Sequence, residues 1–316
     1  MTPLHLTTPL LEHRRLSVAL GKRVLLKLEN VQPSGSFKLR GIGLLCQRAV
    51  ARGGTHLICS SGGNAGFAAA VAGAALGVRT TILVPTTTSE AVRQKIRELG
   101  ATVLEHGAVW DETDLEARRL SSVPGAVYVP PFDHPDIWEG NSTLIDEALL
   151  QSRALGVEPD VVICSVGGGG LMAGVLQGLE RHGLTQVPLI AVETKGAESL
   201  HAAIEAGALV TLPAITSLAT SLGAKRVAAE AFAWTRRHPV HSVVVTDERA
   251  LEASRRFADD LRALVEPACG AALSVVYDRL PVLEPFQHPL IVVCGGIGVS
   301  LALLSAPGAT AAPSAR

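Results

Sequence analysis

The sequence has few charged and few aromatic residues. Of its 316 residues, 18% are charged and 3% are aromatic, and the formal net charge is −1 with no basic block. A nucleic-acid-binding surface needs clustered Lys and Arg side chains and aromatic platforms on which bases stack. The composition therefore excludes nucleic acid as an expected partner.

Signals for membranes and secretion are also missing. No apolar run with suitable flanks reaches the length of about 20 residues that spans a bilayer. The N-terminal stretch MTPLHLTTPLLEHRR contains no charged region followed by an apolar region, so it does not resemble a secretory signal. We expect a soluble, cytoplasmic protein with no membrane partner.

The sequence also lacks closely spaced cysteines. The sequence has five scattered cysteines and no C-x-x-C pair, which argues against both metal-ligand spacing and a disulfide framework. We expect buried free thiols at Cys46, Cys59, Cys164, Cys269 and Cys294.

Apolar residues, by contrast, make up 47% of the chain, enough for a sizeable core. Short β-branched runs without polar alternation are typical of strands buried on both faces of a parallel sheet. Strands are expected at 55–60, 80–85, 160–166, 188–194, 241–246 and 289–295.

Helical patterns lie between these runs, at 64–77, 89–100 and 247–264. Ser89 and Asp247 stand where N-caps belong, and Gly100 stands where a glycine ends a helix. The alternation of strands and helices predicts a doubly wound α/β architecture.

A proline-rich segment with little periodicity, VPPFDHPDIWEGN at 129–141, indicates a boundary between two lobes. We expect a small lobe over 41–132 and a large lobe formed by 1–40 and 133–304. The Pro- and Ala-rich tail at 305–316 is expected to be disordered.

Three predicted strands end in glycine-rich turns that lead into helices: CSSGGNAG (59–66), SVGGGGLMAG (165–174) and VVCGGIGVS (292–300). Ligands of open α/β sheets bind at the carboxyl ends of strands, where helix N-termini present free N–H groups. Four consecutive glycines let the backbone approach an oxyanion closely, which indicates a phosphate.

A nicotinamide dinucleotide is one candidate for this phosphate ligand. Gly168, Gly170 and Ala173 satisfy a loose G-x-G-x-x-A pattern, and Glu193 ends the next strand where a ribose-binding acid belongs. This NAD-binding oxidoreductase hypothesis leaves PSGSFKLRG (33–41) and SSGGNAG (60–66) without a role. Lys38, inside PSGSFKLRG, fits equally a surface cation, a phosphate clamp or a nucleophilic amine when the stretch is considered alone.

Taken together, these motifs resemble a known family. PSGSFKLRG, SSGGNAGFAAA, SVGGGGLMAGV and VVCGGIGVS resemble the serine/threonine dehydratases of fold type II, which are pyridoxal-phosphate (PLP) enzymes related to tryptophan synthase β. YVPPFDHPDIWEGN, AVETKGAESLHAA and LVEPACGAALSVVY resemble the L-serine dehydratase and serine dehydratase-like branch. The similarity runs from about residue 5 to 303, and it implies two doubly wound open-sheet lobes.

The resemblance implies roles for residues around the cofactor. Lys38 is the lysine that forms the Schiff base, and desolvation would lower its pKa toward neutrality. Phe37 is its apolar neighbour, Asn64 bonds the 3′ oxygen, and Cys294 faces the pyridine nitrogen as a weak neutral partner. The phosphate lies on Gly167, Gly168, Gly169, Gly170 and Leu171.

Substrate and cation sites are implied in the same way. The substrate carboxylate is held by the loop Ser61, Gly62, Gly63, Asn64 and Ala65. Gly62 stands where efficient serine dehydratases carry alanine, so we expect modest turnover. A monovalent cation, usually K⁺, is surrounded by Glu193, Ala197, Ser199 and Leu222.

Alternative structural roles remain for several of these residues. Asn64 could be a helix N-cap, and Glu193 could pair with a lysine. LVEPACGAA is a recognisable family segment, yet Glu266, Cys269 and Gly270 could serve only to pack the large lobe, and His134 and His201 are expected to be structural.

The activity implied is that of a PLP-dependent L-serine ammonia-lyase with L-threonine as a second substrate. β-Elimination of water from these hydroxy amino acids gives pyruvate or 2-oxobutanoate, and ammonia. A serine racemase, a β-replacing synthase and a nearly inactive PLP-binding protein stay open as alternatives. The resemblance also implies a homodimer.

Overall fold

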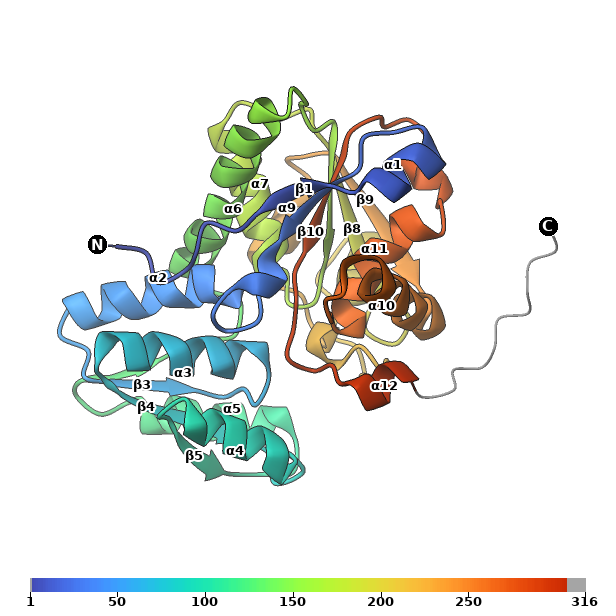
Figure 1. The fold of residues 1–316 in the computed structure, drawn as a ribbon. Coiled ribbons are helices and arrows are strands. Elements are labelled where there is room, and N and C mark those ends of the chain that lie inside the picture. Colours follow the sequence, from blue (N-terminus) through green and yellow to red (C-terminus); the bar gives the residue numbers. More distant parts are fainter. Residues whose placement is uncertain (1, 306–316) are drawn as a thin grey trace.

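The computed structural model describes residues 2–305. Figure 1 shows two lobes, each built on one open sheet. The larger sheet has six strands in the order β1-β2-β10-β7-β8-β9, and the smaller sheet has four in the order β5-β4-β3-β6. All pairings between neighbouring strands are parallel except the antiparallel pair β1·β2 at one edge. The predicted α/β class with two doubly wound lobes is confirmed.

The bounds of the elements are as follows. The strands are β1 (Leu10–Glu12), β2 (Leu25–Leu28), β3 (His56–Cys59), β4 (Arg79–Val84), β5 (Thr102–Glu105), β6 (Ala126–Tyr128), β7 (Val161–Ser165), β8 (Leu189–Thr194), β9 (Val240–Val245) and β10 (Pro289–Val293). The helices are α1 (Arg14–Leu20), α2 (Lys38–Ala51), α3 (Asn64–Leu76), α4 (Glu90–Glu98), α5 (Trp110–Leu120), α6 (Pro135–Ala154), α7 (Gly170–Arg181), α8 (Ser199–Ala206), α9 (Ala229–Trp234), α10 (Asp247–Leu261), α11 (Pro267–Tyr277) and α12 (Leu301–Ser305). Short 3₁₀ segments are η1 (Glu29–Val31), η2 (Thr220–Leu222) and η3 (Pro281–Leu283).

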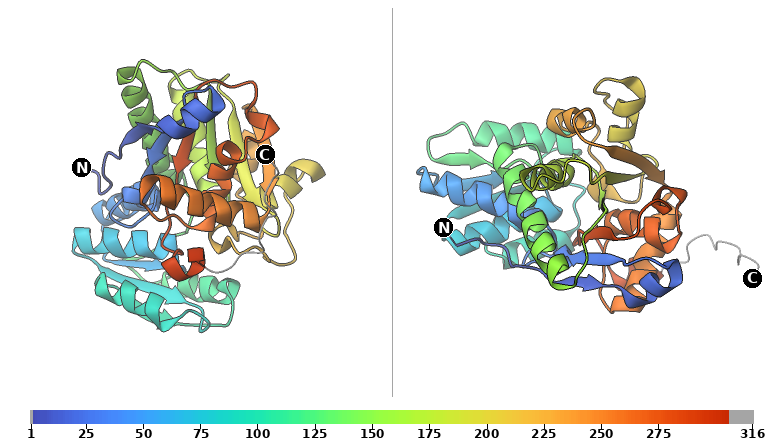
Figure 2. Two further views of the ribbon diagram at one scale, coloured as in Figure 1. Left: turned by 45° about the vertical axis from the view of Figure 1, so that its right-hand side comes forward. Right: turned by 90° about the horizontal axis from the view of Figure 1, so that it is seen from above.

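Helices cover both faces of the large sheet. Figures 1 and 2 show α6 and α7 on one side and α10 and α11 on the other. Strands β7, β8 and β10 are buried at every residue, and so is α11. This explains why these strands read as continuous apolar runs, since both of their faces meet packed helices.

Both faces of the small sheet are buried, and successive side chains along its strands pack into two different cores. Leu57 and Ile82 pack into one core with α2 and α3, whereas their neighbours Ile58 and Leu83 pack on the opposite side with Ala117 of α5. The period of two in side-chain direction accounts for this division.

The predicted strands and helices agree with the structure to within about three residues at their ends. Ser89 caps α4 by accepting a hydrogen bond from the Val92 N–H, and Gly100 follows that helix with φ +84°. The predicted cap at Asp247 is wrong by one residue. Thr246 caps α10, because the Asp247 carboxylate instead accepts hydrogen bonds from Ser217 and the Leu218 N–H.

The low-periodicity segment 129–141 contains the start of a helix. α6 begins at Pro135, and the His134 ring accepts a hydrogen bond from the Asp136 N–H as its N-cap. All four strands of the small sheet lie between His56 and Tyr128, while the lobe boundaries at 40/41 and 132/133 remain predictions.

The last described residue, Ser305, ends α12, and the rest of the tail predicted to be disordered lies outside the described residues.

Within residues 2–305, no helix is long and apolar enough to cross a membrane.

Candidate active site

The glycine turns of the two lobes meet between the sheets. The turns after β7 and β10 are neighbours because these strands are paired, and the turn after β3 comes from the small lobe. A hydrogen bond of 2.8 Å from the Ile297 N–H to Asn64 Oδ1 joins the turn after β10 to the start of α3. The three turns therefore form one region at the carboxyl ends of strands, where α/β proteins bind ligands.

Lys38 is the first residue of α2 and is half-buried in this region. Its Nζ donates a hydrogen bond to the Pro131 carbonyl at 2.5 Å and lies 5.2 Å from the centre of the Phe37 ring. Burial lowers its pKa to about 8, while the nearby Cys59, Glu266 and Cys294 oppose that shift. A neutral, nucleophilic amine is therefore accessible close to neutral pH.

The backbone around Lys38 is attached to the large lobe on both sides. The Phe37 N–H donates to the Cys294 carbonyl at 3.2 Å. Two residues after Lys38, the fully buried Arg40 guanidinium bonds Glu29 and Glu147, each at 2.7 Å. This buried charge network holds the N-terminal turn of α2 against η1 and α6.

Four consecutive glycines, Gly167 to Gly170, form a turn in which a residue with a side chain would be strained at each position. Gly169 has φ +88°, and a side chain at Gly168 would lie 2.3 Å from the Phe132 ring. Among the described residues, no hydrogen bond uses the N–H groups of Gly168, Gly169 or Gly170. Gly170 and Leu171 begin α7, whose first N–H groups have no intrahelical acceptor. The turn is a cradle suited to an anion.

The lysine and this cradle are linked through two consecutive residues. Pro131 accepts the hydrogen bond from Lys38, and the next residue, Phe132, packs on Gly168 and Gly170. The structure therefore links the amine to the cradle through Pro131 and Phe132.

Asn64 lies at the centre of a hydrogen-bond network rather than at a helix cap. The N-cap of α3 is Gly63, and the Asn64 side chain makes no capping bond, so the N-cap alternative is wrong. Its Nδ2 donates to Glu266 Oε1 at 2.8 Å and lies 3.4 Å from the Ser221 hydroxyl.

Cys294 follows β10 and is buried beside another thiol. A hydrogen bond with Cys269 and burial raise the pKa of Cys294 well above its usual value. The thiol is therefore neutral at physiological pH. Cys269 therefore lies against a predicted site residue.

The predicted carboxylate loop, residues 61–65, runs into the first turn of α3. Ser61 Oγ accepts a hydrogen bond from the Gly63 N–H at 3.2 Å. A methyl group added to Gly62 would lie 3.2 Å from Val84 and 3.3 Å from Thr88, so only small shifts would make room for it. The loop is half-buried at Ser61, Gly62 and Gly63, and buried at Ala65.

Glu193 is fully buried at the end of β8. Its two oxygens accept hydrogen bonds from the Leu200 and His201 N–H groups, both at 2.8 Å, and burial raises its pKa to about 8. No ion pair joins it to a lysine among the described residues, so the lysine alternative is not supported. Because the side chain is fully buried, Glu193 is poorly placed to bind a ribose.

The other predicted cation ligands adjoin this carboxylate and the glycine turn. Ala197, Ser199 and Leu222 are buried, and the Ser199 hydroxyl has no hydrogen-bond partner among the described residues. A side chain at Gly167 would lie 2.9 Å from Leu222 Cα. No cluster of three or more His, Cys, Asp or Glu side chains suited to a metal occurs within residues 2–305.

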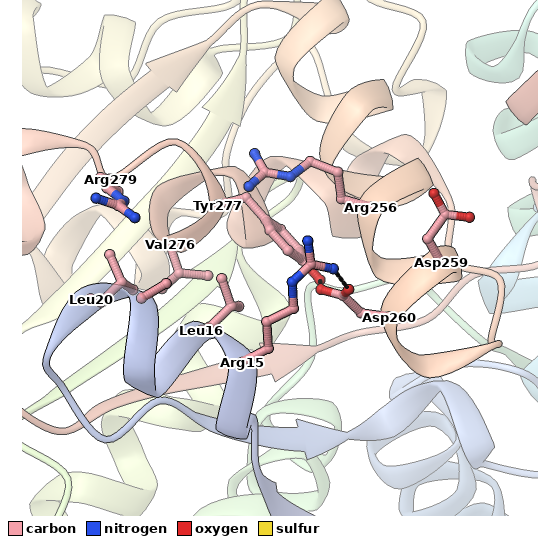
Figure 3. A pocket seen from close by; sticks show the side chains of 10 residues that line it. Arg15, Leu16, Leu20, Arg256, Asp259, Asp260, Val276, Tyr277 and Arg279 are labelled. Atoms are coloured by element: carbon pink, nitrogen blue, oxygen red, sulfur yellow. Dashed lines mark hydrogen bonds and ion pairs between the residues drawn. The ribbon is translucent and has the colours of Figure 1, made fainter. Parts of the chain in front are cut away.

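A separate cavity of about 290 Å³ lies in the large lobe, away from these residues. Figure 3 shows it between α1, α10 and α11, with the Arg15 side chain directed at Asp260. Tyr277 also donates a hydrogen bond to Asp260, at 3.0 Å. None of the predicted site residues lines this cavity, so we do not assign the active site to it.

Two residues of the site were missed by the sequence analysis. Pro131 accepts the lysine hydrogen bond, and Glu266, for which the sequence suggested no role besides packing, contacts Asn64. The only sequence signal for Glu266 was its position before Pro267 at a helix start, within a segment that resembles the family.

Comparisons with known proteins bear directly on this site. Residues 1–295 match the family described as pyridoxal-phosphate dependent enzyme. The chain belongs to this family. Nicotinamide binding, the competing hypothesis for the glycine turns, is therefore set aside in favour of PLP.

Individual members of the PLP family are similar over nearly the whole chain. A serine dehydratase-like protein of Rattus norvegicus is 50% identical, covering 94% of this chain and 92% of the relative. An L-serine dehydratase/L-threonine deaminase of Bos taurus is 47% identical, covering 96% and 95%. The crystal structure of a fungal L-serine ammonia-lyase from Rhizomucor miehei has a TM-score of 0.90 and 39% identity, covering 95% of this chain and 97% of that chain.

The residues present fit PLP on structural grounds. A half-buried amine of lowered pKa, free backbone N–H groups for a phosphate and a neutral thiol are the groups that such a cofactor needs.

Proposed function

We propose that this chain is an L-serine ammonia-lyase that also acts on L-threonine, releasing ammonia and pyruvate or 2-oxobutanoate. The observation that carries the proposal is the link between Lys38 and the tetraglycine cradle through Pro131 and Phe132. The similarity over most of the chain to proteins named for serine and threonine dehydration supports this substrate class.

The cofactor contributes the electron sink: when bound, PLP withdraws electrons from the substrate α-carbon, so that the bonds around that carbon become labile. Lys38 would hold the cofactor aldehyde, and the N–H groups of Gly167 to Gly170 and Leu171 would hold its phosphate. Asn64 would donate a hydrogen bond to its ring oxygen.

Lys38 is also our candidate for the general base. Its lowered pKa gives a neutral amine at slightly alkaline pH, and a neutral amine is needed to remove the substrate α-proton. The hydrogen bond to the Pro131 carbonyl holds this amine next to Phe132, which packs on the glycine turn.

The substrate carboxylate would bind at residues 61–65. The start of α3 presents N–H groups and the positive end of the helix dipole to an anion. Fixing the carboxylate there orients the α-proton and the β-hydroxyl for elimination.

Cys294 would favour elimination over competing PLP reactions. A thiol that stays neutral does not hold a proton on the pyridine nitrogen as an aspartate would, so the ring withdraws fewer electrons. The reaction then favours prompt loss of the β-hydroxyl over transamination.

We also propose a K⁺ site at Glu193, Ala197, Ser199 and Leu222. Supporting observations are the buried carboxylate and the unpartnered Ser199 hydroxyl, since hard monovalent cations prefer oxygen ligands. A homodimer and a cytoplasmic location remain predictions from the sequence.

An absorption spectrum and a keto-acid assay together test the activity. We expect visible absorbance that borohydride bleaches, and release of pyruvate from L-serine and of 2-oxobutanoate from L-threonine. Lys38→Ala should lose both the absorbance and the activity. Normal serine turnover by the folded K38A protein would contradict the proposal.

Two product measurements distinguish the alternatives. Chiral analysis that finds D-serine, with little keto acid, would favour a racemase instead. A thioether or another β-substituted product formed with an added nucleophile would favour a β-replacing synthase.

A further inference from the structure

Glu266 is a buried carboxylate that the mechanism above does not use. It is 3% exposed and occupies the N-cap position of α11. A side chain at this position usually accepts a helix N–H, but the Glu266 side chain makes no such bond. Its carboxylate therefore serves another contact.

The carboxylate points instead into the region where the glycine turns meet. Oε1 accepts the hydrogen bond from Asn64 Nδ2 at 2.8 Å, and Oε2 accepts one from the Gly298 N–H at 3.2 Å. A side chain at Gly296 would lie 1.9 Å from the Glu266 carboxyl carbon. The turn after β10 is thus built closely around this carboxylate.

Glu266 determines which way the Asn64 amide faces. An ionised carboxylate only accepts hydrogen bonds, so it requires the Nδ2 end of the amide. The Ile297 N–H, 2.8 Å from Oδ1, requires the oxygen at the other end. A flipped amide would place oxygen against oxygen and N–H against N–H.

One N–H of Asn64 remains weakly used. Within residues 2–305, its only other partner is the Ser221 hydroxyl at 3.4 Å, which is long for a hydrogen bond. This N–H is available to an acceptor on a bound ligand, provided that the amide keeps its orientation.

Glu266 also acts on Lys38 through charge. In the described part of the chain, the ionisable groups that influence the charge of the Lys38 amine are Glu266 and the thiols of Cys59 and Cys294, and of these only Glu266 is a carboxylate. Burial raises the pKa of Glu266, whereas the amides of Asn64 and Gly298, the Ser221 hydroxyl and Lys38 favour its ionised form. A negative charge at this position stabilises a positive charge on the lysine nitrogen.

We infer that Glu266 is a positioning residue: it fixes the Asn64 amide with one N–H directed at the cofactor ring oxygen, and it places a carboxylate within electrostatic reach of Lys38. The inference rests on the proposed function.

The test compares Glu266→Gln and Glu266→Asp with Glu284→Gln, a matched change at an exposed glutamate. Gln removes the charge, while Asp keeps the charge but is too short to hold Asn64. Each variant is purified as the full chain with PLP, and thermal unfolding checks its fold. The visible absorbance is titrated with pH, and kcat and KM are measured for L-serine.

For E266Q we expect kcat to fall by about 10- to 100-fold, the loss typical of residues that orient a ligand-binding group. The pH midpoint of the visible absorbance should move to lower pH, because the nitrogen has lost its anionic partner. E266D should lower kcat similarly but keep a midpoint near that of the parent, and E284Q should change neither.

Wild-type kcat and an unmoved midpoint in folded E266Q would overturn the inference. If E266Q does not fold, the E266D variant tests the inference in its place. A wild-type kcat in E266D would then overturn the inference. Failure of the proposed function is distinguishable from failure of this inference, because the parent protein itself would then lack the visible absorbance. In that case the pH dependence of Lys38 acetylation, followed by mass spectrometry on the full chain, still reports whether E266Q lowers the lysine pKa.

Discussion

At Lys38, opposing effects act on a single amine. Desolvation favours the neutral form, while Glu266 and two thiols favour the charged form, and the balance is a pKa of about 8. An exposed lysine has a pKa of about 10.4 and would offer almost no neutral amine at neutral pH. The reactivity of this residue therefore comes from its surroundings.

The first prediction concerns pH. If Lys38 removes the α-proton, kcat for L-serine should rise as the pH increases through about 8, because the amine is free only after the substrate has taken its place on the cofactor and must then be unprotonated to act. Initial rates at saturating L-serine between pH 6 and 9.5 measure this dependence. A rate that falls over this range would exclude Lys38 as the base.

Glu193 gives a second prediction at the same scale. Its pKa is raised from 4.5 to about 8 by burial, so the folded protein keeps a proton that the unfolded chain releases near pH 4.5. Its contribution to the free energy of unfolding is complete below pH 4.5 and is lost as the pH rises to about 8. Glu193→Gln should flatten this part of the dependence of Tm on pH.

Potassium should reverse this loss of stability at high pH, because a bound cation stabilises the ionised Glu193 carboxylate. At pH 8.5, KCl should raise Tm more than tetramethylammonium chloride at equal ionic strength, and E193Q should abolish the difference. Equal Tm values for the two salts in the parent protein would count against a K⁺ site.

At the scale of elements, the start of α3 carries three functions: it packs the small lobe, presents free N–H groups and positions Asn64. Small residues make this possible. A side chain at Gly66 would lie 1.7 Å from the Ser61 carbonyl, whereas one at Gly62 would fit after small shifts. The two glycines therefore differ in what they permit.

The third prediction compares these glycines. Gly62→Ala should raise kcat/KM for L-serine, since an added methyl group narrows the substrate loop, and should change the free energy of unfolding by no more than about 1 kcal/mol. Gly66→Ala should destabilise the protein strongly or prevent folding. Steady-state kinetics and thermal unfolding measure both, and an unchanged Tm in G66A would show that the loop geometry is wrong.

At the scale of the whole molecule, the two lobes share the site but have separate cores. A contact outside the cores joins them: Lys225, between η2 and α9, forms an ion pair of 2.9 Å with Asp111 of α5. Both side chains are about half exposed. The pair is placed to favour the approach of the lobes.

The fourth prediction follows from the exposure of this pair. Lys225→Ala should raise KM for L-serine by at most about fivefold, because an exposed ion pair contributes no more than about 1 kcal/mol. The difference should shrink with added salt, and kcat should stay the same. Lys95→Ala, at an exposed lysine of α4, is the control. An equal increase of KM in K225A and K95A would show that the ion pair between Lys225 and Asp111 does not assist the approach of the lobes.

Much of this architecture could be predicted from the sequence, because its signals are local. Uninterrupted β-branched runs indicated β7, β8 and β10 as buried parallel strands, and glycine-rich turns indicated the ligand-binding ends of those strands. The shift of one residue at the start of α10 shows the limit of such signals. Asp247 and Thr246 are both good N-caps, and a contact of Asp247 with Ser217 decided between them.

The sequence by itself determined the class of fold, the order of its elements and, through a set of motifs, the family. The tertiary structure alone decided that Glu266 faces Asn64, a residue 202 positions away, and that Pro131 receives the lysine hydrogen bond. Such contacts depend on how two sheets are placed against each other, which no local pattern encodes. The lowered pKa of Lys38 is of the same kind, because desolvation comes from atoms distant in sequence that surround the amine only after folding.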